Sequence, residues 1–409
     1  MKLWKRNLIF CWFGMFVTGI GMSQIAPVMP LYIKHLGITD AASVSEFSGI
    51  AFGITFIISA IFSPIWGNAA DRFGRKPMLL RASLGMAIVI GSMGFAPNVY
   101  VLIGLRMLQG VITGYSTACT TLIATQTDKE CAGFALGTLS TANISGSLLG
   151  PTIGGFIEDT VGVQPVFFIT GGLMLIAFLA TLLFVKEDFN REQVKVLTTK
   201  EIWRTVPEKN LTIVLGVTYM VITMALYTIE PIVTVYVSKL SVNSSHVAFI
   251  SGLAFSASGL ANIISAPRLG KLSDKIGAHK VMLVCLIIAG LIYIPQAFVK
   301  SAWQLIALRF LLGLTLGGLN PSVNTLVKKI TPESITGRIF GLTISAAYLG
   351  TFAGSVLGGQ VAARLGVNYV FFITSALLLI NAVWVYKKVY IKLNVSENEI
   401  LNTKEYLAS

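Results

Sequence analysis

The chain has 409 residues, of which 54% are hydrophobic and only 12% are charged, and its mean hydropathy is +0.76. A soluble domain carries about 25% charged residues, so this composition excludes an ordinary soluble enzyme. The formal net charge of +13 would suggest nucleic-acid binding in a polar chain, but here Lys and Arg lie between long apolar runs, so no nucleic-acid partner is expected.

Apolar runs between charged breaks predict twelve membrane-spanning helices in an all-α polytopic membrane protein. In chain order the predicted spans are residues 8–33, 46–67, 78–96, 99–124, 131–157, 165–185, 211–237, 246–268, 281–299, 302–327, 336–363 and 368–390. A polar stretch, residues 186–210, is predicted to be a cytoplasmic loop between two six-helix bundles, residues 1–185 and 211–390. Residues 391–409 form a predicted cytoplasmic tail.

The distribution of positive charge predicts the orientation of the chain. If both termini are cytoplasmic, 25 of the 31 Lys and Arg residues fall in cytoplasmic segments and four in external loops, while Arg106 and Arg309 lie inside apolar runs. Cytoplasmic loops of membrane proteins are enriched in Lys and Arg. We therefore expect a multi-pass protein of the plasma or inner membrane with both termini inside, and the short loops suggest a bacterial one.

The two halves are repeats of each other. Three separated landmarks recur at a shift of 203 or 204 residues: Asp71 as Asp274, Arg106 as Arg309, and Val166–Thr170 as Val370–Thr374. Repeats of six spans run parallel, so an axis along the membrane normal should relate them, with a substrate site at their interface near the bilayer midplane. The repeat pattern alone is typical of a transporter.

The segment after the second predicted span is a candidate gating motif. Its residues are Gly67, Asp71, Arg72, Gly74, Arg75 and Lys76. Anchoring of the inner face by basic residues would explain Arg and Lys, but not the spacing of Gly and Asp. The second copy keeps Asp274 but has Ala278 and His279 in place of Arg75 and Lys76, so we expect gating to depend on the first copy.

Arg106 lies inside the fourth predicted span, three residues before Gln109. An Arg in the middle of a membrane costs about 2.5 kcal/mol or more and usually faces a cavity or a partner. Arg106 is therefore a candidate for tuning a proton site or holding an anionic group. The alternative is a structural Arg that satisfies the carbonyl groups of a neighbouring helix.

A glycine motif marks the fifth predicted span. It comprises Gly146, Gly150, Pro151, Gly154 and Gly155. Small residues at this spacing form a smooth face for close helix packing, and Pro151 removes a backbone hydrogen bond and bends the helix. The corresponding segment of the second half, residues 350–359, keeps the glycines but has no proline. Close helix packing alone explains the glycines of the second copy, whereas Pro151 in the first copy requires a further role.

Glu230 is the only carboxylate deep within an apolar run, and it stands where the first half has Ala26. An acidic residue inside the membrane is by default a functional candidate, here as a proton carrier or as a counter-charge for a cationic substrate. The alternative is a hydrated, idle side chain near the outer mouth, because barely two helical turns separate Glu230 from the end of the span.

These motifs together resemble those of the major facilitator superfamily. The segment Gly67–Pro77 and the string Arg106–Gly110 resemble two of its motifs, and Gly146–Gly155 resembles the signature of its exporters, the twelve-span drug:proton antiporters. Further strings are similar to multidrug resistance proteins of the MdtG type: Trp4–Ile9, Ala135–Thr141 and Ala266–Leu272.

The resemblance implies alternating access, with efflux of amphiphilic, drug-like compounds in exchange for protons. It implies that Asp71 and Arg75 help lock the cytoplasmic gate, that Arg106 takes part in proton coupling, and that Gly150 and Pro151 shape a bend that favours export. Glu230 lies outside these shared motifs, so its predicted role in coupling depends on its own position in the sequence. A monomer in the lipid bilayer is expected, with small-molecule substrate and protons as partners.

Polar and aromatic residues in the predicted spans are candidates for the substrate cavity. They are Gln24, Tyr115, Asn143, Tyr227, Asn320, Asn324 and Tyr348. Hydrogen bonding between helices is the alternative for each. A proton-driven importer of a sugar or metabolite would need more charged cavity residues, and a receptor or scaffold would need a large soluble segment. No nucleophile–base pair or metal-ligand set is evident, so neither an enzyme nor a bound metal or cofactor is predicted.

Overall fold

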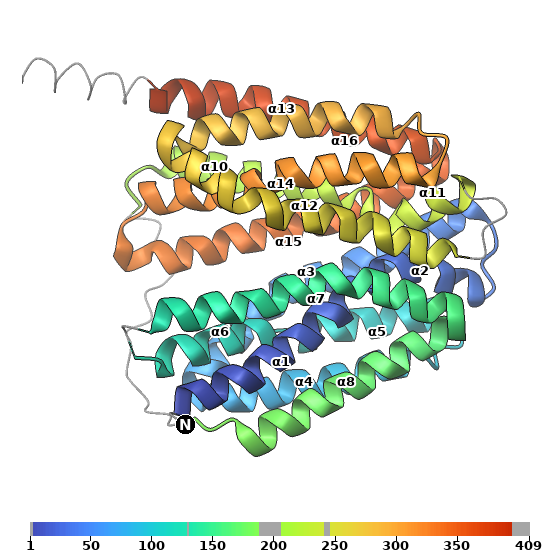
Figure 1. The fold of residues 1–409 in the computed structure, drawn as a ribbon, viewed down its shortest axis with the longest axis horizontal. Helices are drawn as coiled ribbons and strands as arrows, with labels where there is room; N and C mark the ends of the chain where they lie inside the picture. The colour runs from blue at the N-terminus through green and yellow to red at the C-terminus, as the bar shows by residue number, and fades with distance from the viewer. Residues whose placement is uncertain (1–2, 129–130, 188–205, 241–245, 395–409) are drawn as a thin grey trace, which may run out of the picture.

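The computed structural model describes residues 3–128, 131–187, 206–240 and 246–394, and within these ranges the chain is helical, without strands (Figure 1). The helices are α1 (Leu3–Ser23), α2 (Ile25–His35), α3 (Ala41–Phe73), α4 (Arg75–Met93), α5 (Val99–Ile112), α6 (Tyr115–Gln126), α7 (Ala132–Val161), α8 (Val163–Phe184), α10 (Lys209–Tyr227), α11 (Val233–Leu240), α12 (Val247–Ile276), α13 (Ala278–Gln296), α14 (Ala302–Ile330), α15 (Glu333–Arg364) and α16 (Val367–Val385). A 3-10 turn, η1 (Glu230–Ile232), precedes α11, and a π-helix, η2 (Tyr386–Tyr390), follows α16. The predicted all-α class is confirmed.

Each predicted span coincides with a helix or a consecutive group of helices. In the described part of the chain, nine helical segments are long and apolar enough to cross a membrane, and α1 with α2, bent by 47°, makes a tenth. Helices α4 and α7 are less apolar but run beside the others (Figure 1). Most of the predicted central loop and of the tail lies outside the described residues.

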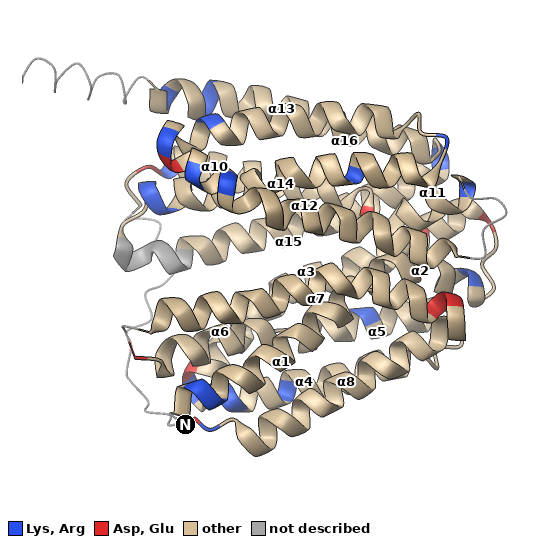
Figure 2. Cartoon of the chain, viewed as in Figure 1, with Lys and Arg blue, Asp and Glu red and all other residues tan. Residues whose placement is uncertain are grey.

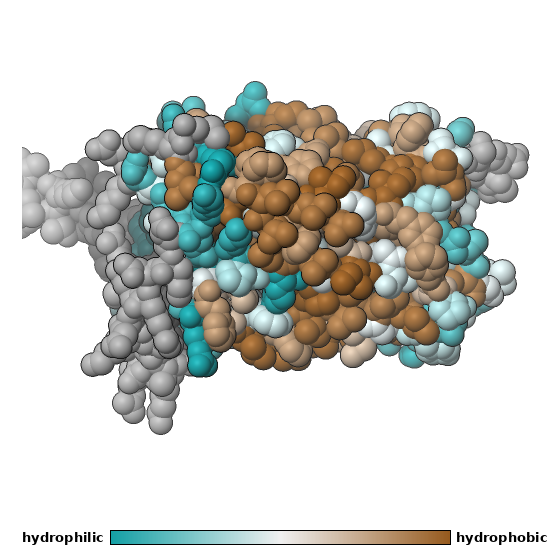
Figure 3. Space-filling model, turned by 90° about the horizontal axis from the view of Figure 1, so that it is seen from below, coloured by the Kyte–Doolittle hydropathy of each residue, from teal (hydrophilic) through white to brown (hydrophobic). Residues whose placement is uncertain are grey.

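The outer surface is apolar around its middle. Figure 3 shows hydrophobic residues covering the centre of one face, with hydrophilic residues toward its ends. We call the end where Leu3 lies the terminal end and the opposite end the distal end. Lys and Arg gather at the terminal end (Figure 2), as expected for the cytoplasmic end of a membrane protein.

The first spanning segment of each half is broken at the same place. In the first half α1 ends at Ser23 and α2 begins at Ile25, and in the second η1 separates α10 from α11. The side chains at the two breaks also correspond, because Gln24 donates to Thr170, and Thr228 lies 2.5 Å from Thr374 between hydroxyl oxygens. Both pairs are related by a shift of 204 residues, so the sequence repeat is also a structural repeat.

Two helix pairs join the halves, and we call them the seams: α7 with α12, and α3 with α15. A Cβ at Gly155 would lie 2.3 Å from the carbonyl oxygen of Ala248, and one at Gly359 would lie 2.6 Å from that of Ser45. Side chains at these positions would collide with main chain, which explains why glycine is needed. The two contacts correspond in the repeat, so the seams are symmetric.

The halves share polar contacts along the α7–α12 seam, where Ser256 donates to the Leu148 carbonyl oxygen at 2.5 Å and its hydroxyl lies 2.7 Å from that of Thr152, and others lie toward the distal end. The Thr234 hydroxyl donates to the Pro27 carbonyl oxygen at 2.9 Å. The Asp159 carboxylate, at the end of α7, accepts hydrogen bonds from the backbone N–H groups of Phe249 at 2.9 Å and Ala248 at 3.3 Å. Toward the terminal end the ribbons of the two halves diverge (Figure 1).

The contact of Asp159 is a helix cap that crosses between the halves. Helix α12 receives no capping hydrogen bond from the side chain of its own N-cap residue, His246, so Asp159 of the other half satisfies its first N–H groups. The equivalent helix α3 is capped within its own half, because Asp40 accepts from the Ser43 N–H at 2.8 Å. These bonds lower the pKa of the exposed Asp40 carboxyl.

Candidate functional site

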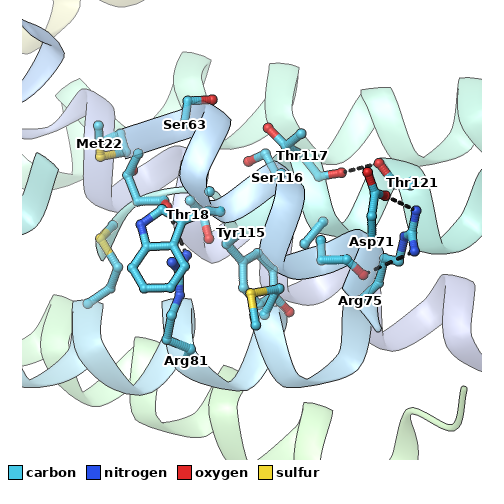
Figure 4. A pocket seen from close by; sticks show the side chains of 18 of the residues that line it. Thr18, Met22, Ser63, Asp71, Arg75, Arg81, Tyr115, Ser116, Thr117 and Thr121 are labelled. Atoms are coloured by element: carbon cyan, nitrogen blue, oxygen red, sulfur yellow. Dashed lines mark hydrogen bonds and ion pairs between the residues drawn. The ribbon is translucent and has the colours of Figure 1, made fainter. Parts of the chain in front are cut away.

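A cavity of about 290 Å³ lies between α1, α3, α4, the start of α6 and α15 (Figure 4), and its lining reaches Asp71 and Arg75 toward the terminal end. Most of its wall comes from the first half, including Thr18, Met22, Trp66 and Tyr115. Tyr348 of α15 is the contribution of the second half. The lining combines aromatic rings, thioethers and hydroxyl groups, which suits an amphiphilic ligand.

Arg81 is a cavity residue that sequence reasoning missed. The charge distribution assigns it to the cytoplasmic loop, but it lies within α4, and its guanidinium stacks 3.5 Å from the ring centre of Trp66. Its Nη2 donates to the carbonyl oxygens of Ile112 and Thr113, both at 3.0 Å. Its position inside the predicted span 78–96 was the signal that could have identified it, as it did for Arg106.

An aromatic cluster joins the cavity to the second half. Tyr348, in the cavity wall, lies 6.1 Å from Phe56 between ring centres. Tyr227 of α10 lies 5.8 Å from Phe56 and 5.9 Å from Phe52. The cluster therefore contains rings from α3, α10 and α15 and includes two of the predicted cavity residues.

The other predicted cavity residues are dispersed. Tyr115 lines the cavity, and its hydroxyl lies 3.1 Å from that of Thr181. Gln24 is buried and bonded to another helix, as the alternative interpretation states. Asn143 and Asn324 are exposed and do not line this cavity, and neither does Asn320. Substrate contact by any of these residues remains a prediction.

The candidate gating motif is folded around a helix break. Gly74 has φ +94°, a conformation that favours glycine, and it separates α3 from α4. Across the break, Arg75 Nη2 lies 2.7 Å from Asp71 Oδ1, and Nη1 donates to the Ala70 carbonyl oxygen at 3.1 Å. The ion pair lies wholly in the first half, so the predicted lock against the second half remains a prediction.

Other members of the motif have separate positions. Gly67 lines the cavity, Arg72 lies 5.2 Å from the ring centre of Phe73, and Asp274 is exposed without an ion pair among the described residues. Glu187 accepts from the backbone N–H groups of Arg75 at 2.8 Å and Lys76 at 2.7 Å. This cap ties the start of the central loop to the motif, and sequence reasoning did not find it.

Arg106 is buried and engaged with three acceptors. Its Nε donates to the Ala51 carbonyl oxygen at 2.8 Å, its Nη1 to Gln109 Oε1 at 2.5 Å, and its Nη2 to the Phe52 carbonyl oxygen at 3.3 Å. These bonds fix α5 against α3, which favours the structural alternative. A role in proton coupling remains a prediction.

Glu230 is the first residue of η1, at the break in the first span of the second half. It is partly exposed, between the fully buried Ile229 and Ile232. It interacts electrostatically with Arg309 of α14, whose side chain is buried. Both residues are conspicuous in the sequence as charges within apolar runs, but nothing in the sequence indicates that they interact.

Comparisons with known proteins agree with this architecture. The family model described as Major Facilitator Superfamily matches residues 11–250 and 215–403. Multidrug resistance proteins MdtG of Salmonella arizonae and Salmonella schwarzengrund are each 45% identical to this chain over 382 residues, covering 93% of the chain and 95% of each relative.

Solved structures share the fold at low identity. A bacterial homologue of the human lysosomal transporter Spinster, in an inward-facing and unoccupied conformation, has a TM-score of 0.78 at 14% identity, covering 95% of this chain and 97% of that one. The nucleoside transporter NupG has a TM-score of 0.74 at 14% identity, covering 95% and 100%. With the family match and the MdtG relatives, the conclusion is plain: this multi-pass membrane protein belongs to the major facilitator superfamily.

Proposed function

We propose that this protein exports amphiphilic, drug-like small molecules across the bacterial cell membrane in exchange for protons. The observation that carries the proposal is the cavity, whose lining reaches toward the terminal end, while hydrogen bonds join the halves at the distal end. With both termini in the cytoplasm, this arrangement faces inward and is ready to load substrate from inside. The MdtG relatives, named as multidrug resistance proteins, support export.

The substrate binds among apolar and aromatic side chains. Trp66, Tyr115 and Tyr348 offer flat rings, and Met22 offers a flexible thioether that adapts to different shapes. Such a wall selects by size and apolar area rather than by a fixed set of hydrogen bonds, which accounts for a broad substrate range.

The transport cycle is a rocking of the two bundles, residues 1–185 and 211–390, about the seams. Asp71 and Arg75 close the cytoplasmic side in the outward-facing state. Gly150, which packs against Ile20 of α1, and Pro151, which packs against Gly252 of α12, shape a bend in α7 that favours export. The protein acts as a monomer in the bilayer, because one chain supplies both halves of the cavity. Glu230 carries the proton, and the protein is a transporter rather than an enzyme.

Dye transport in inverted membrane vesicles tests this function. We expect an imposed proton gradient, acidic inside, to drive dye accumulation, and an uncoupler to abolish it. Glu230→Gln should remove the gradient-driven part, because an amide cannot exchange a proton. Glu208→Gln is the matched control, since Glu208 is half-exposed, pairs with Lys392 and does not line the cavity.

The same assay identifies the competing functions. Dye accumulation that survives collapse of the gradient contradicts proton antiport. Gradient-driven uptake of one sugar or metabolite by intact cells indicates an importer, and the absence of any transport by correctly inserted protein indicates a receptor or scaffold.

A further inference from the structure

The fourth spanning segment of the first half is broken beside the cavity. Helix α5 ends at Ile112 and α6 begins at Tyr115, and between them Gly114 has φ +126°, a conformation that favours glycine. The corresponding segment of the second half is the single helix α14, which continues through Gly317 at the position of Gly114. The break is therefore a feature of the first half alone.

The carbonyl groups at the end of α5 are satisfied by two side chains that line the cavity. Trp66 Nε1 donates to the Val111 carbonyl oxygen at 2.6 Å, and Arg81 Nη2 donates to those of the next two residues, both at 3.0 Å. In the second half the two positions hold Leu269 and Val284, so both donors are absent there. The first half thus has its own means of holding the end of α5 at the break.

The start of α6, on the other side of the break, has no such partners. Its N-cap residue is a glycine without a capping side chain, and the N–H groups of Tyr115, Ser116 and Thr117 form no hydrogen bond within the described part of the chain. All three residues line the cavity. The free N–H groups and the positive end of the helix dipole favour an anion at this position.

Arg81 places a positive charge beside this helix start. A Cβ at Gly114 would lie 3.4 Å from Arg81 Nη2, and Figure 4 shows Arg81 in the cavity wall next to Tyr115. The other guanidinium nitrogens of Arg81, Nε and Nη1, are buried without a hydrogen-bond partner among the described residues. The remaining charged residues of the wall, Asp71 and Arg75, pair with each other at 2.7 Å. Arg81 is therefore the unpaired charge of the described cavity wall, and such a charge favours a counter-ion.

We propose that the α5–α6 break is the subsite for one acidic group of the substrate, and that the protein exports amphiphilic acids in preference to neutral or cationic amphiphiles. The oxygens of a carboxylate or sulfonate accept hydrogen bonds from the first N–H groups of α6, and Arg81 supplies the opposite charge. The apolar part of the substrate lies against Met22, Trp66 and Tyr348. The preference for acids rests on the proposed export function, whose substrate class it specifies.

A purely structural role for Arg81 explains less of the geometry. Holding the end of α5 requires only Nη2, and it leaves Nε, Nη1 and the first N–H groups of α6 without acceptors. Each buried donor without an acceptor costs free energy. An acidic group of the substrate supplies an acceptor and a counter-charge together, and broken helices of other transporters direct their N-termini at anionic substrate groups in this way.

Binding of matched fluorescent probes to the purified, full-length protein tests the proposal. The probes are dansylaminoundecanoic acid and its primary amide, which differ in charge but scarcely in size. Binding is followed in detergent by energy transfer from tryptophan to dansyl, with empty micelles as the blank. We expect wild-type protein at neutral pH to bind the acid about tenfold more tightly than the amide, which is the effect of one hydrogen-bonded ion pair. The corresponding dansyl amine, a cation, should bind more weakly than the amide.

Substitutions of Arg81 separate its charge from its contact with α5. Arg81→Gln keeps an N–H donor for the α5 carbonyl groups, so the affinity for the amide should stay the same while the preference for the acid disappears. Arg81→Lys keeps the charge and should keep the acid as the tighter ligand. Arg268→Gln is the matched control and should keep the full preference, because Arg268 donates to the Ile264 carbonyl oxygen of its own helix and does not line the cavity.

The outcomes distinguish the acid subsite from the proposed export. Equal binding of acid and amide by wild-type protein refutes the subsite, and the wild-type series of acid, amide and amine gives that answer even if Arg81→Gln folds poorly. A preference that survives in Arg81→Gln, or an equal weakening of both probes, refutes Arg81 as the partner of the acid. A failure of export shows instead in inverted vesicles, where no probe, charged or neutral, accumulates under an imposed gradient, and it leaves the binding preference standing.

Discussion

Replacing Asp159 by alanine should shift the protein toward the outward-facing state. Asp159 caps α12 across the distal end, and its side chain is only 6% exposed, so solvent screens the contact little. The cap is absent once the distal end opens. Its loss therefore destabilises the inward-facing state relative to the outward-facing one.

The size of the shift follows from the two hydrogen bonds. Bonds to a charged acceptor contribute about 1.5–3 kcal/mol, and the bond to Ala248 is long at 3.3 Å, so the contact as a whole should be near the middle of that range. Each 1.4 kcal/mol is about a tenfold change, so the ratio of outward- to inward-facing protein should rise between about tenfold and a hundredfold. Asp159→Asn keeps one acceptor without the charge and should give roughly half the free-energy change.

Distance measurements by double electron–electron resonance between two spin labels can detect the shift. Spin labels at Tyr100 and Trp303, which are 73% and 69% exposed, report the separation of the halves, with Cys131 replaced by serine because the other three cysteines are buried. Asp40→Ala removes a similar cap within one half and should leave the distance distribution unchanged. Equal distributions in wild type and Asp159→Ala would refute the reasoning, as would an equal shift in Asp40→Ala.

Three further substitutions test individual contacts. Arg106→Ala should lower the melting temperature in detergent by several degrees, while the folded protein keeps gradient-driven efflux. Loss of efflux at an unchanged melting temperature would instead indicate a role of Arg106 in proton coupling. Gly155→Ala should abolish transport at normal expression, because the added Cβ would collide with the main chain of α12. Gly137→Ala on the same helix is the control and should keep transport, because open space surrounds Gly137. Equal transport by the two variants would contradict the need for close packing at Gly155. Trp66→Ala should raise the dye concentration for half-maximal efflux about tenfold, whereas Trp303→Ala, at an exposed position, is the control and should leave it unchanged. An unchanged value in Trp66→Ala would show that Trp66 does not contact the dye.

Much of the fold was predictable because its signals are local or periodic. Long apolar runs locate the spans, and the shift of 203 or 204 residues aligns the halves. The close packing of Gly155 was predictable in kind, since small residues four apart allow helices to approach. The residue that packs against Gly155 was not predictable, because nothing in the sequence near Gly155 indicates a contact with Ala248.

The site was harder to predict because its contacts join distant parts of the chain. Asp159 and Phe249 are 90 residues apart, and a carboxylate at a helix end gives no sign of which helix it caps. Glu230 and Arg309 were each conspicuous as charges in apolar runs, but their interaction depends on where η1 lies relative to α14. Arg81 was misplaced because a single charge near the start of a span is equally consistent with a loop.

The seams also bear on how easily the halves can move. At Gly155 and Gly359 main chain meets main chain, so tilting one half requires few changes of rotamer at these two points, whereas Phe56 and Tyr348 place rings against each other elsewhere on the α3–α15 seam. The balance between the two orientations then depends on side-chain contacts between the halves, including the polar contacts of Asp159 and Thr234 at the distal end. A single substitution at the distal end could then change the turnover rate of a relative without altering which compounds its cavity accepts.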